Sequence, residues 1–210
     1  MDEDNSKDKV RRPRQSRSIK TKQSILKAAM ELFSQKGYHK TNTKEIAALA
    51  GVSTGSFYSY YVDKRAVFLD ALKLYHQEFN DRLIPSLGAM KLKDGNRVEL
   101  ISHFIDSLVD AHDVFTEFHA ELQVMYHSDP EVKEFSDKQI QYSRELTASY
   151  MEEWKDELQV TDIKAASIVV FEVINRIVDV IVYEADDLVI AHLKKELVDM
   201  IVHYLFEPKK

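Results

Sequence analysis

Apolar residues along the chain recur mostly three or four positions apart, the spacing that places side chains on one face of an α-helix. No meander of alternating strands stands out, and the few glycines and prolines lie mostly near expected helix ends. We therefore predict an all-α fold with nine helices. The expected ranges are 18–36, two short helices within 43–64, 63–84 with Pro85 near its end, 97–111, 114–127, 130–157, 163–183 and 188–206.

Segment 43–64 contains two short helical patterns joined by a tight turn. Asn42 and Glu45 have the spacing of a capping box at the start of the first helix. Gly51 suits the left-handed backbone conformation that ends this helix, and Ser53 suits the N-cap of the second. These start, corner and stop signals predict a helix-turn-helix.

The second helix of this pair is expected to have an inner and an outer face. Phe57 is expected inside, beside Ile46 and Leu49 of the first helix. The outer face carries short residues that would let the helix enter a DNA major groove, followed by tyrosines whose hydroxyls can donate to phosphates. The outer residues are Thr54, Gly55, Ser56 and Ser59, and the tyrosines are Tyr58, Tyr60 and Tyr61. An ordinary helical hairpin with surface tyrosines is the alternative.

Base reading is assigned to Thr54 and Ser56, with Lys44 as a further candidate, because these side chains can bond or contact base edges. Lys64, at the start of the next helix, adds a cation suited to phosphate.

This part of the chain resembles the tetracycline-repressor (TetR) family of bacterial transcriptional regulators over about residues 24–68. The residues that carry the resemblance are ILKAAMELFSQKGYHKT (25–41), IAALAGVSTGSFYSYYVDK (46–64) and Ala66-Val67-Phe68. It departs from many members at Tyr61 and Val62, where those have Tyr-Phe or His-Phe followed by a polar residue. The resemblance implies phosphate contacts by Thr43, Tyr58 and Lys64, and a groove-facing set of Thr54, Gly55, Ser56 and Tyr60.

Charge is divided unevenly along the chain. Residues 1–64 contain 13 lysines and arginines against 7 acidic residues, a net charge of +6, whereas the remainder has a net charge of −12. Double-stranded DNA should therefore meet one end of the molecule. The basic segment 1–17 is expected to be either a disordered arm that follows the duplex or a solvated tail.

The helices at 163–183 and 188–206 indicate self-association. The first leaves almost no polar face and therefore needs cover on most sides. A second copy of the same helix pair would supply it, and a buried central helix in a monomer is the alternative. The residues assigned to this homodimer interface are Ile174, Ile177, Ile181, Leu197 and Ile201.

Aromatic residues in the middle of the chain suggest a cavity for a small-molecule effector. The candidate lining residues are Phe104, Phe115, Phe118, His119, Tyr126, Tyr142, Trp154 and Asn175. By the family resemblance, a largely apolar molecule would shift the fourth helix and release the operator. The histidines are too far apart for a compact metal motif, so we expect neither a metal nor a cofactor.

These features favour a ligand-relieved repressor with three parts: a basic arm at 1–17, a helix-turn-helix domain at 18–64, and a ligand-binding and dimerisation domain at 65–210. An architectural DNA-binding protein without an inducer is the second hypothesis. An enzyme is disfavoured because the chain lacks a glycine-rich phosphate loop, a G-x-S-x-G elbow, an H-E-x-x-H motif and any cysteine. No signal peptide or membrane span is recognised, so a cytoplasmic protein is expected.

Overall fold

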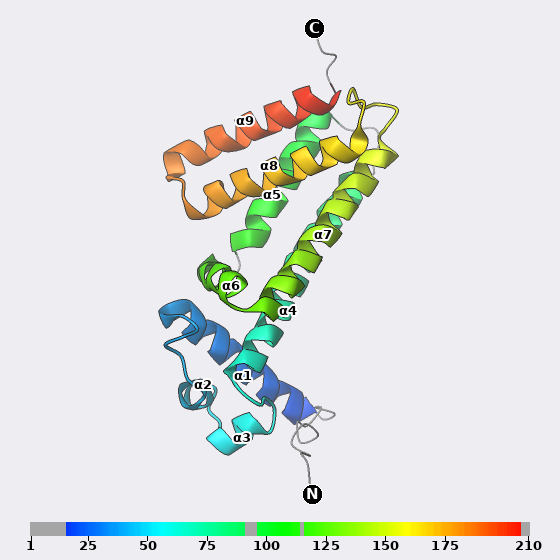
Figure 1. The fold of residues 1–210 in the computed structure, drawn as a ribbon. Coiled ribbons are helices and arrows are strands. Elements are labelled where there is room, and N and C mark those ends of the chain that lie inside the picture. Colours follow the sequence, from blue (N-terminus) through cyan, green and yellow to red (C-terminus); the bar gives the residue numbers. More distant parts are fainter. Residues whose placement is uncertain (1–15, 91–95, 114–115, 207–210) are drawn as a thin grey trace, which may run out of the picture. The chain divides into compact units, whose positions relative to one another are not determined.

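The computed structural model describes residues 16–90, 96–113 and 116–206, and within these ranges it contains nine α-helices and no strand (Figure 1). The predicted all-α, nine-helix architecture is confirmed for this part of the chain. The helices are α1 (Ser16–Lys36), α2 (Thr43–Leu49), α3 (Thr54–Tyr58), α4 (Lys64–Met90), α5 (Arg97–Asp113), α6 (Thr116–Ser128), α7 (Pro130–Glu153), α8 (Ile163–Tyr183) and α9 (Asp187–Phe206).

Two helix ends differ from the sequence-based prediction by more than two residues. Helix α4 continues through Pro85 to Met90, although proline removes one backbone donor from a helix. The next residue, Ser86, donates a side-chain hydrogen bond of 2.6 Å to Ser107 of α5, which holds this turn of α4 in place. Helix α7 ends at Glu153 rather than near 157. The backbone that follows Glu153 forms successive turns closed by hydrogen bonds between residues three apart.

The chain divides into two compact units. Unit 1 comprises residues 1–76 and 117–133, so its described part holds α1, α2, α3, the first half of α4, α6 and the start of α7. Unit 2 comprises residues 77–116 and 134–210. The sequence-based division places one boundary at residue 64 and so assigns α6 to the C-terminal domain. The contacts within the fold instead group α6 with α1, α2, α3 and the first half of α4.

Aromatic rings from three helices form the core of unit 1. Phe33 of α1, Phe68 of α4 and Phe118 of α6 are at most 1% exposed. The Phe68 ring centroid lies 5.5 Å from that of Phe33 and 5.4 Å from that of Phe118. Burial of one such side chain contributes roughly 1.5–3 kcal/mol. Helix α6 is therefore part of the core that supports α2 and α3.

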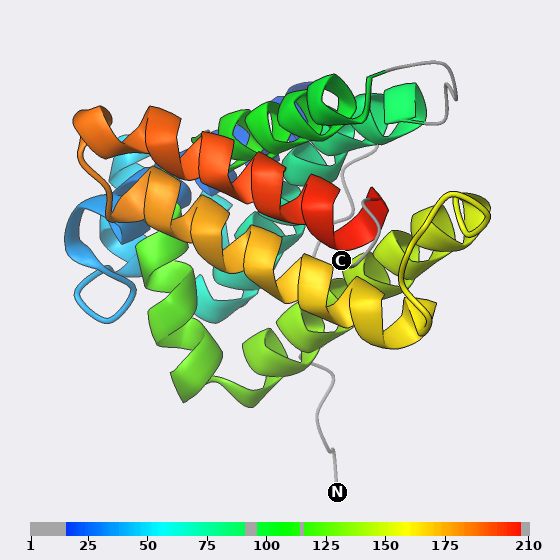
Figure 2. The same cartoon turned by 90° about the horizontal axis from the view of Figure 1, so that it is seen from above.

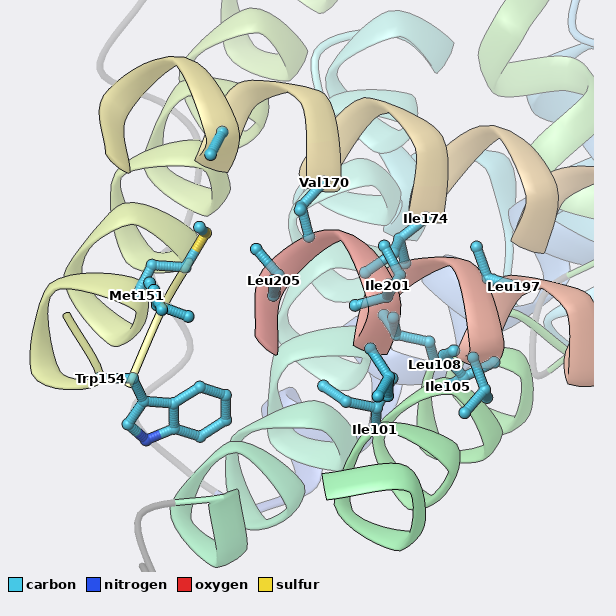
Figure 3. Packing of buried hydrophobic residues seen from close by; sticks show 14 of the residues in the cluster. Ile101, Ile105, Leu108, Met151, Trp154, Val170, Ile174, Leu197, Ile201 and Leu205 are labelled. Atoms are coloured by element: carbon cyan, nitrogen blue, oxygen red, sulfur yellow. The ribbon is translucent and has the colours of Figure 1, made fainter. Parts of the chain in front are cut away.

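Helices α5, α8 and α9 form the core of unit 2. Figure 2 shows α8 and α9 side by side, as expected for consecutive helices joined by a short connection. Figure 3 shows side chains of α5, α8 and α9 meeting between the three helices. The labelled residues from these helices are Ile101, Ile105, Leu108, Val170, Ile174, Leu197, Ile201 and Leu205. Among the described residues, no helix is both long and apolar enough to cross a membrane.

Candidate nucleic-acid interface

A capping box starts α2. The Asn42 side-chain oxygen accepts hydrogen bonds from the backbone N–H groups of Lys44 and Glu45 at 3.1 and 3.0 Å. A Glu45 carboxylate oxygen accepts from the Asn42 N–H at 3.0 Å. The Lys36 ammonium, 2.6 Å from this carboxylate, and the Asn42 N–H lower the pKa of Glu45. The predicted cap is confirmed, and it fixes where α2 begins.

The corner between α2 and α3 follows the sequence prediction. Gly51 has a φ of 69°, the left-handed conformation that glycine adopts without steric cost. The Val52 N–H donates to the Ala47 carbonyl at 2.9 Å and closes the turn. The Ser53 hydroxyl then accepts from the Ser56 N–H at 3.1 Å and caps α3. Local hydrogen bonds therefore set the geometry of both helices.

The inner face of this pair differs from the prediction at two positions. Ile46 and Phe57 are fully buried as expected, but Leu49 is 47% exposed. Because Ala47 is also buried, the inner face centres on positions 46 and 47, and Leu49 lies roughly 160° around the helix from Ala47. Tyr61 is 3% exposed, so its place on the outer face is also wrong. It lies one turn after Phe57 and shares its side.

Most residues predicted to face DNA lie on one surface of unit 1, which we call the α2–α3 surface. Its members are Thr43, Lys44, Thr54, Gly55, Ser56 and Tyr58, each exposed or half-buried. The hydroxyl oxygens of Thr43 and Tyr58 lie 3.0 Å apart, so the first residue of α2 contacts the last residue of α3. This surface presents short hydroxyl side chains, a glycine and one lysine, which suit close approach to a polyanion.

Tyr60 occupies a different place. Its side chain is half-buried, and its hydroxyl lies 3.1 Å from the Ser18 hydroxyl of α1. The tyrosine therefore ties the turn after α3 to the start of α1. A phosphate contact by this hydroxyl would have to share or replace the bond to Ser18.

Lys64 is half-buried and forms hydrogen bonds within the protein. Its ammonium donates to the carbonyl oxygens of Tyr38 and Thr41 at 2.7 and 2.9 Å and approaches that of His39 at 3.4 Å. It also lies 4.3 Å from the centre of the Tyr38 ring. Partial burial lowers the pKa of Lys64, opposed by the charge of Glu121. Because an ammonium has three donors, direct phosphate contact by Lys64 would require these bonds to break.

Two polar links in unit 1 have no signal in the sequence. A carboxylate oxygen of Glu121 in α6 accepts the backbone N–H of Tyr38 at 2.6 Å. Arg65 of α4 forms a two-point hydrogen bond with Asp129, which precedes α7. The partners are 83 and 64 residues apart, and only the tertiary fold brings them together.

The predicted ligand-lining residues are divided between the two units. Phe118, His119 and Tyr126 belong to unit 1, where Phe118 is a core residue and the His119 Nδ1 atom lies 3.2 Å from the Tyr75 hydroxyl. Phe115 lies outside the described residues. Within unit 1, Phe118 packs against Phe68 of α4 and His119 contacts Tyr75 of the same helix.

The remaining lining candidates belong to unit 2 but differ in environment. Trp154 is 4% exposed and belongs to the core cluster of unit 2, and Phe104 is half-buried against that cluster. Tyr142, in contrast, is 54% exposed. The Asn175 side chain donates to the Phe171 carbonyl of its own helix at 2.8 Å. Helical spacing alone could not separate core from lining positions here. Among the described residues, no group of three or more metal-binding side chains is suited to hold an ion.

Most residues expected at a dimer interface are buried within unit 2. Ile174, Ile181, Leu197 and Ile201 are at most 7% exposed and belong to the interior of unit 2. Ile177 is half-buried against the same core. The apolar residues left exposed on these helices are Ile168, Val169, Leu188, Val189 and Met200. The sequence showed that α8 has more apolar residues than one packing face needs. Which of them are buried within the chain depends on how α5 and α9 pack against α8.

Family models match most of the chain. Residues 25–71 match the model described as "Bacterial regulatory proteins, tetR family", and residues 98–205 match "Tetracyclin repressor-like, C-terminal domain". The first match contains the whole α2–α3 surface. The second covers about half of the chain and includes α6.

Curated relatives match a limited part of the chain. The transcriptional regulator YuxN of Bacillus subtilis is 38% identical over 60 residues, which are 29% of this chain and 21% of YuxN. The regulator RutR of Escherichia coli is 39% identical over 61 residues, 29% of each chain. The match spans between 19% and 43% of the length of the first three curated relatives.

Solved structures share the fold of nearly the whole chain. A proposed TetR-family regulator from Mesorhizobium loti superimposes with a TM-score of 0.73 at 19% identity, covering 91% of this chain and 100% of that one. The fatty acid degradation regulator FadR from Bacillus halodurans gives a TM-score of 0.65 at 18% identity, covering 85% and 94%. At these identities the similarity concerns the fold alone.

Proposed function

The chain belongs to the TetR family of bacterial regulatory proteins, and on this basis we propose that it is a homodimeric repressor that binds a palindromic DNA operator and is released by a small, largely apolar molecule. The relatives named above are transcriptional regulators rather than enzymes. Operator binding, dimerisation and release are the parts of the proposal that go beyond family membership.

The α2–α3 surface carries the DNA-binding part of the proposal. Thr54 and Gly55 are exposed at the N-terminus of α3, and Phe57 is fully buried and anchors the helix. Short side chains let a helix descend into the major groove, where hydroxyl and methyl groups reach base edges. We assign phosphate contacts to Thr43 and Tyr58, base contacts to Thr54 and Ser56, and a supporting role to Lys44.

The exposed apolar residues of α8 and α9 support dimerisation. Val169 of α8 and Met200 of α9 are 48% and 44% exposed, and neither belongs to the core cluster of unit 2. Several exposed apolar side chains on adjacent helices favour an interface rather than a free surface. We propose that these helices pair with those of a second copy about a two-fold axis. Two reading surfaces about 34–36 Å apart would then reach successive major grooves.

The effector is proposed to bind in the segment 65–210. The half-buried Phe104 and the mixed aromatic and aliphatic interior of unit 2 support a largely apolar ligand. Binding would favour a conformation in which the two reading surfaces no longer match the DNA repeat.

Selection of DNA by the full chain tests the proposal. Duplexes recovered by the protein from a random-sequence pool should contain an inverted repeat with half-sites about one helical turn apart. Sedimentation of the complex should give two subunits per duplex. Recovery of unrelated sequences with equal affinity would instead favour an architectural DNA-binding protein.

A panel of small molecules tests the release step. Titration of apolar compounds into the complex of the protein with the selected duplex should identify at least one that dissociates it. The same compound should raise the thermal unfolding temperature of the free protein, because ligand binding to the folded state stabilises it.

A further inference from the structure

The backbone of Tyr38 is bonded on both sides by side chains from other helices. Its N–H donates to Glu121 of α6 at 2.6 Å, and its carbonyl oxygen accepts from Lys64 of α4 at 2.7 Å. Tyr38 belongs to the loop between α1 and α2, which leads directly to the Asn42 cap. A loop residue with both polar backbone groups bonded in this way has a fixed peptide orientation.

The Glu121 carboxylate fits closely at the end of α1. Gly37 has a φ of 85°, and a Cβ atom added at this position would lie 3.2 Å from a Glu121 carboxylate oxygen. Glycine at 37 is therefore favoured by its backbone conformation and by the space that the carboxylate occupies. Helix α6 thus approaches the α1–α2 loop at a position where the loop has no side chain.

The charge of Glu121 needs compensation at this place. Carbonyl groups at the end of α1 carry partial negative charge, which disfavours a neighbouring carboxylate. The Lys64 ammonium bonds the carbonyls of Tyr38 and Thr41 in the same loop, and the charge of Glu121 raises the pKa of Lys64 against the lowering caused by burial. Glu121 and Lys64 therefore act on one loop as an opposite-charge pair.

The loop determines where α2 begins, and therefore where Thr43 and Lys44 are presented. Thr41, the last residue before the cap, is 2% exposed, and its hydroxyl donates to the Gly37 carbonyl at 2.9 Å. A shift at Tyr38 would consequently be transmitted through Thr41 to the first turn of α2. Of these groups, only Glu121 comes from the C-terminal family model.

We propose that Glu121 is a positioning residue for DNA binding: it does not touch DNA, but its hydrogen bond to the Tyr38 amide places the first turn of α2 for phosphate contact. This inference rests on the proposed DNA-binding function. It makes α6 a required part of the DNA-reading unit, although α6 follows that unit by some 50 residues in the sequence.

Variants of the full chain can separate the reach of the Glu121 side chain from its charge. Glu121→Gln keeps a side-chain oxygen at the same length without charge, whereas Glu121→Asp keeps the charge but withdraws it by one methylene. With the duplex selected by the parent protein, we expect Glu121→Gln to bind within about threefold of the parent and Glu121→Asp to bind about tenfold more weakly. Hydrogen exchange at the Tyr38 and Lys44 amides should be faster in Glu121→Asp than in the parent, but unchanged in Glu121→Gln.

Glu31→Gln provides the control for net charge. Glu31 is an exposed α1 residue that bonds Gln35 within its own helix. Loss of one negative charge should leave the affinity for a polyanion unchanged or raise it. Glu121→Ala removes both the hydrogen-bonding group and the charge, and it should nevertheless weaken DNA binding about tenfold. Its effect on affinity would then be opposite to that of Glu31→Gln, which removes a negative charge only.

The outcomes distinguish this inference from the proposed function. Failure of the parent to select any duplex would contradict DNA recognition itself. Selection by the parent, with equal affinity in folded Glu121→Asp, would overturn the positioning role. Binding by Glu121→Gln as weak as that of Glu121→Ala would also overturn it, because charge rather than the hydrogen bond would then be responsible.

Discussion

Arg65 and Asp129 are joined by a two-point charge-assisted hydrogen bond, with the Arg65 Nε atom 2.6 Å from one carboxylate oxygen and a terminal guanidinium nitrogen 2.8 Å from the other. The same carboxylate accepts the Glu131 N–H at 2.9 Å at the start of α7. One side chain therefore caps α7 and fixes the first turn of α4. The guanidinium hydrogen bond is the main cause that lowers the pKa of Asp129, to about 2.

The Arg65–Asp129 pair should make stability depend on pH. Because the pKa of Asp129 in the folded protein lies below its unfolded value of roughly 3.9, the pair stabilises the fold above that pH and loses its effect as the pH falls toward about 2. Asp129→Asn keeps the cap but removes the charge. We expect a loss of about 1–2 kcal/mol at pH 7, moderated because the Arg65 side chain is 39% exposed.

Urea unfolding at several pH values measures this effect. The difference between the parent and Asp129→Asn should be largest at neutral pH and should narrow below about pH 4. Glu134→Gln, which removes a charge from an exposed pair with Lys138 on α7, should change stability little. A difference between the parent and Asp129→Asn that stays constant down to pH 3 would contradict the assigned role of the ion pair.

Compared with alanine, glycine at position 55 should lower the stability of the fold but strengthen DNA binding. It lies inside α3, and the contact nearest to an added Cβ would be the Ser53 hydroxyl at 3.9 Å, an ordinary distance. The folded chain therefore gives no internal reason for glycine. Gly55→Ala should stabilise the protein by about 0.5–1 kcal/mol while weakening binding to the selected duplex at least about tenfold, because the methyl group projects from the α2–α3 surface.

Gly88→Ala is the matched control for this prediction. Gly88 lies in α4, and no atom would fall within 4 Å of an added Cβ. This substitution should also raise stability, since alanine is the better helix former, but should leave DNA binding unchanged. Unfolding curves and fluorescence anisotropy measure the two effects. Full DNA affinity in Gly55→Ala would show that DNA does not approach this face closely.

Removal of the Tyr58 hydroxyl should weaken DNA binding regardless of sequence. The hydroxyl is shared with Thr43 at 3.0 Å, and phosphate contacts position a protein without selecting bases. Tyr58→Phe should reduce affinity several-fold, about 1 kcal/mol, for selected and unselected duplexes alike. Tyr142→Phe, a change at a similarly exposed tyrosine of α7, should have no effect. A loss confined to the selected sequence would identify Tyr58 as a base-reading residue instead.

A charge on the exposed face of α8 should prevent dimerisation. Val169 is 48% exposed and lies outside the core cluster, so Val169→Lys should leave the subunit folded but yield monomers in sedimentation. Val98→Lys, at a 43% exposed valine of α5, should remain dimeric. Sedimentation of Val169→Lys as a dimer would place the partner surface elsewhere. Ile177 is a poorer site for this test because its substitution would also disturb the core.

Local features of the structure followed from the sequence because they depend on residues within one or two turns of each other. The Asn42–Glu45 capping box and the Gly51 corner are both of this kind. Tyr61 and Leu49 were misplaced for a related reason. An apolar or amphipathic residue at helical spacing can join either edge of the buried face, and only the neighbouring helices decide between the edges.

The sequence by itself determined the order of the helices, the caps of α2 and α3, most of the exposed face of α3 and the family, since each depends on short-range spacing and residue type. Tertiary structure alone decided which face of α8 is buried, that Lys64 bonds loop carbonyls, and that Glu121 reaches Tyr38. The physical reason is range. Hydrogen bonds within a helix join residues four apart, whereas burial and the long-range polar links depend on the simultaneous packing of helices that lie far apart along the chain.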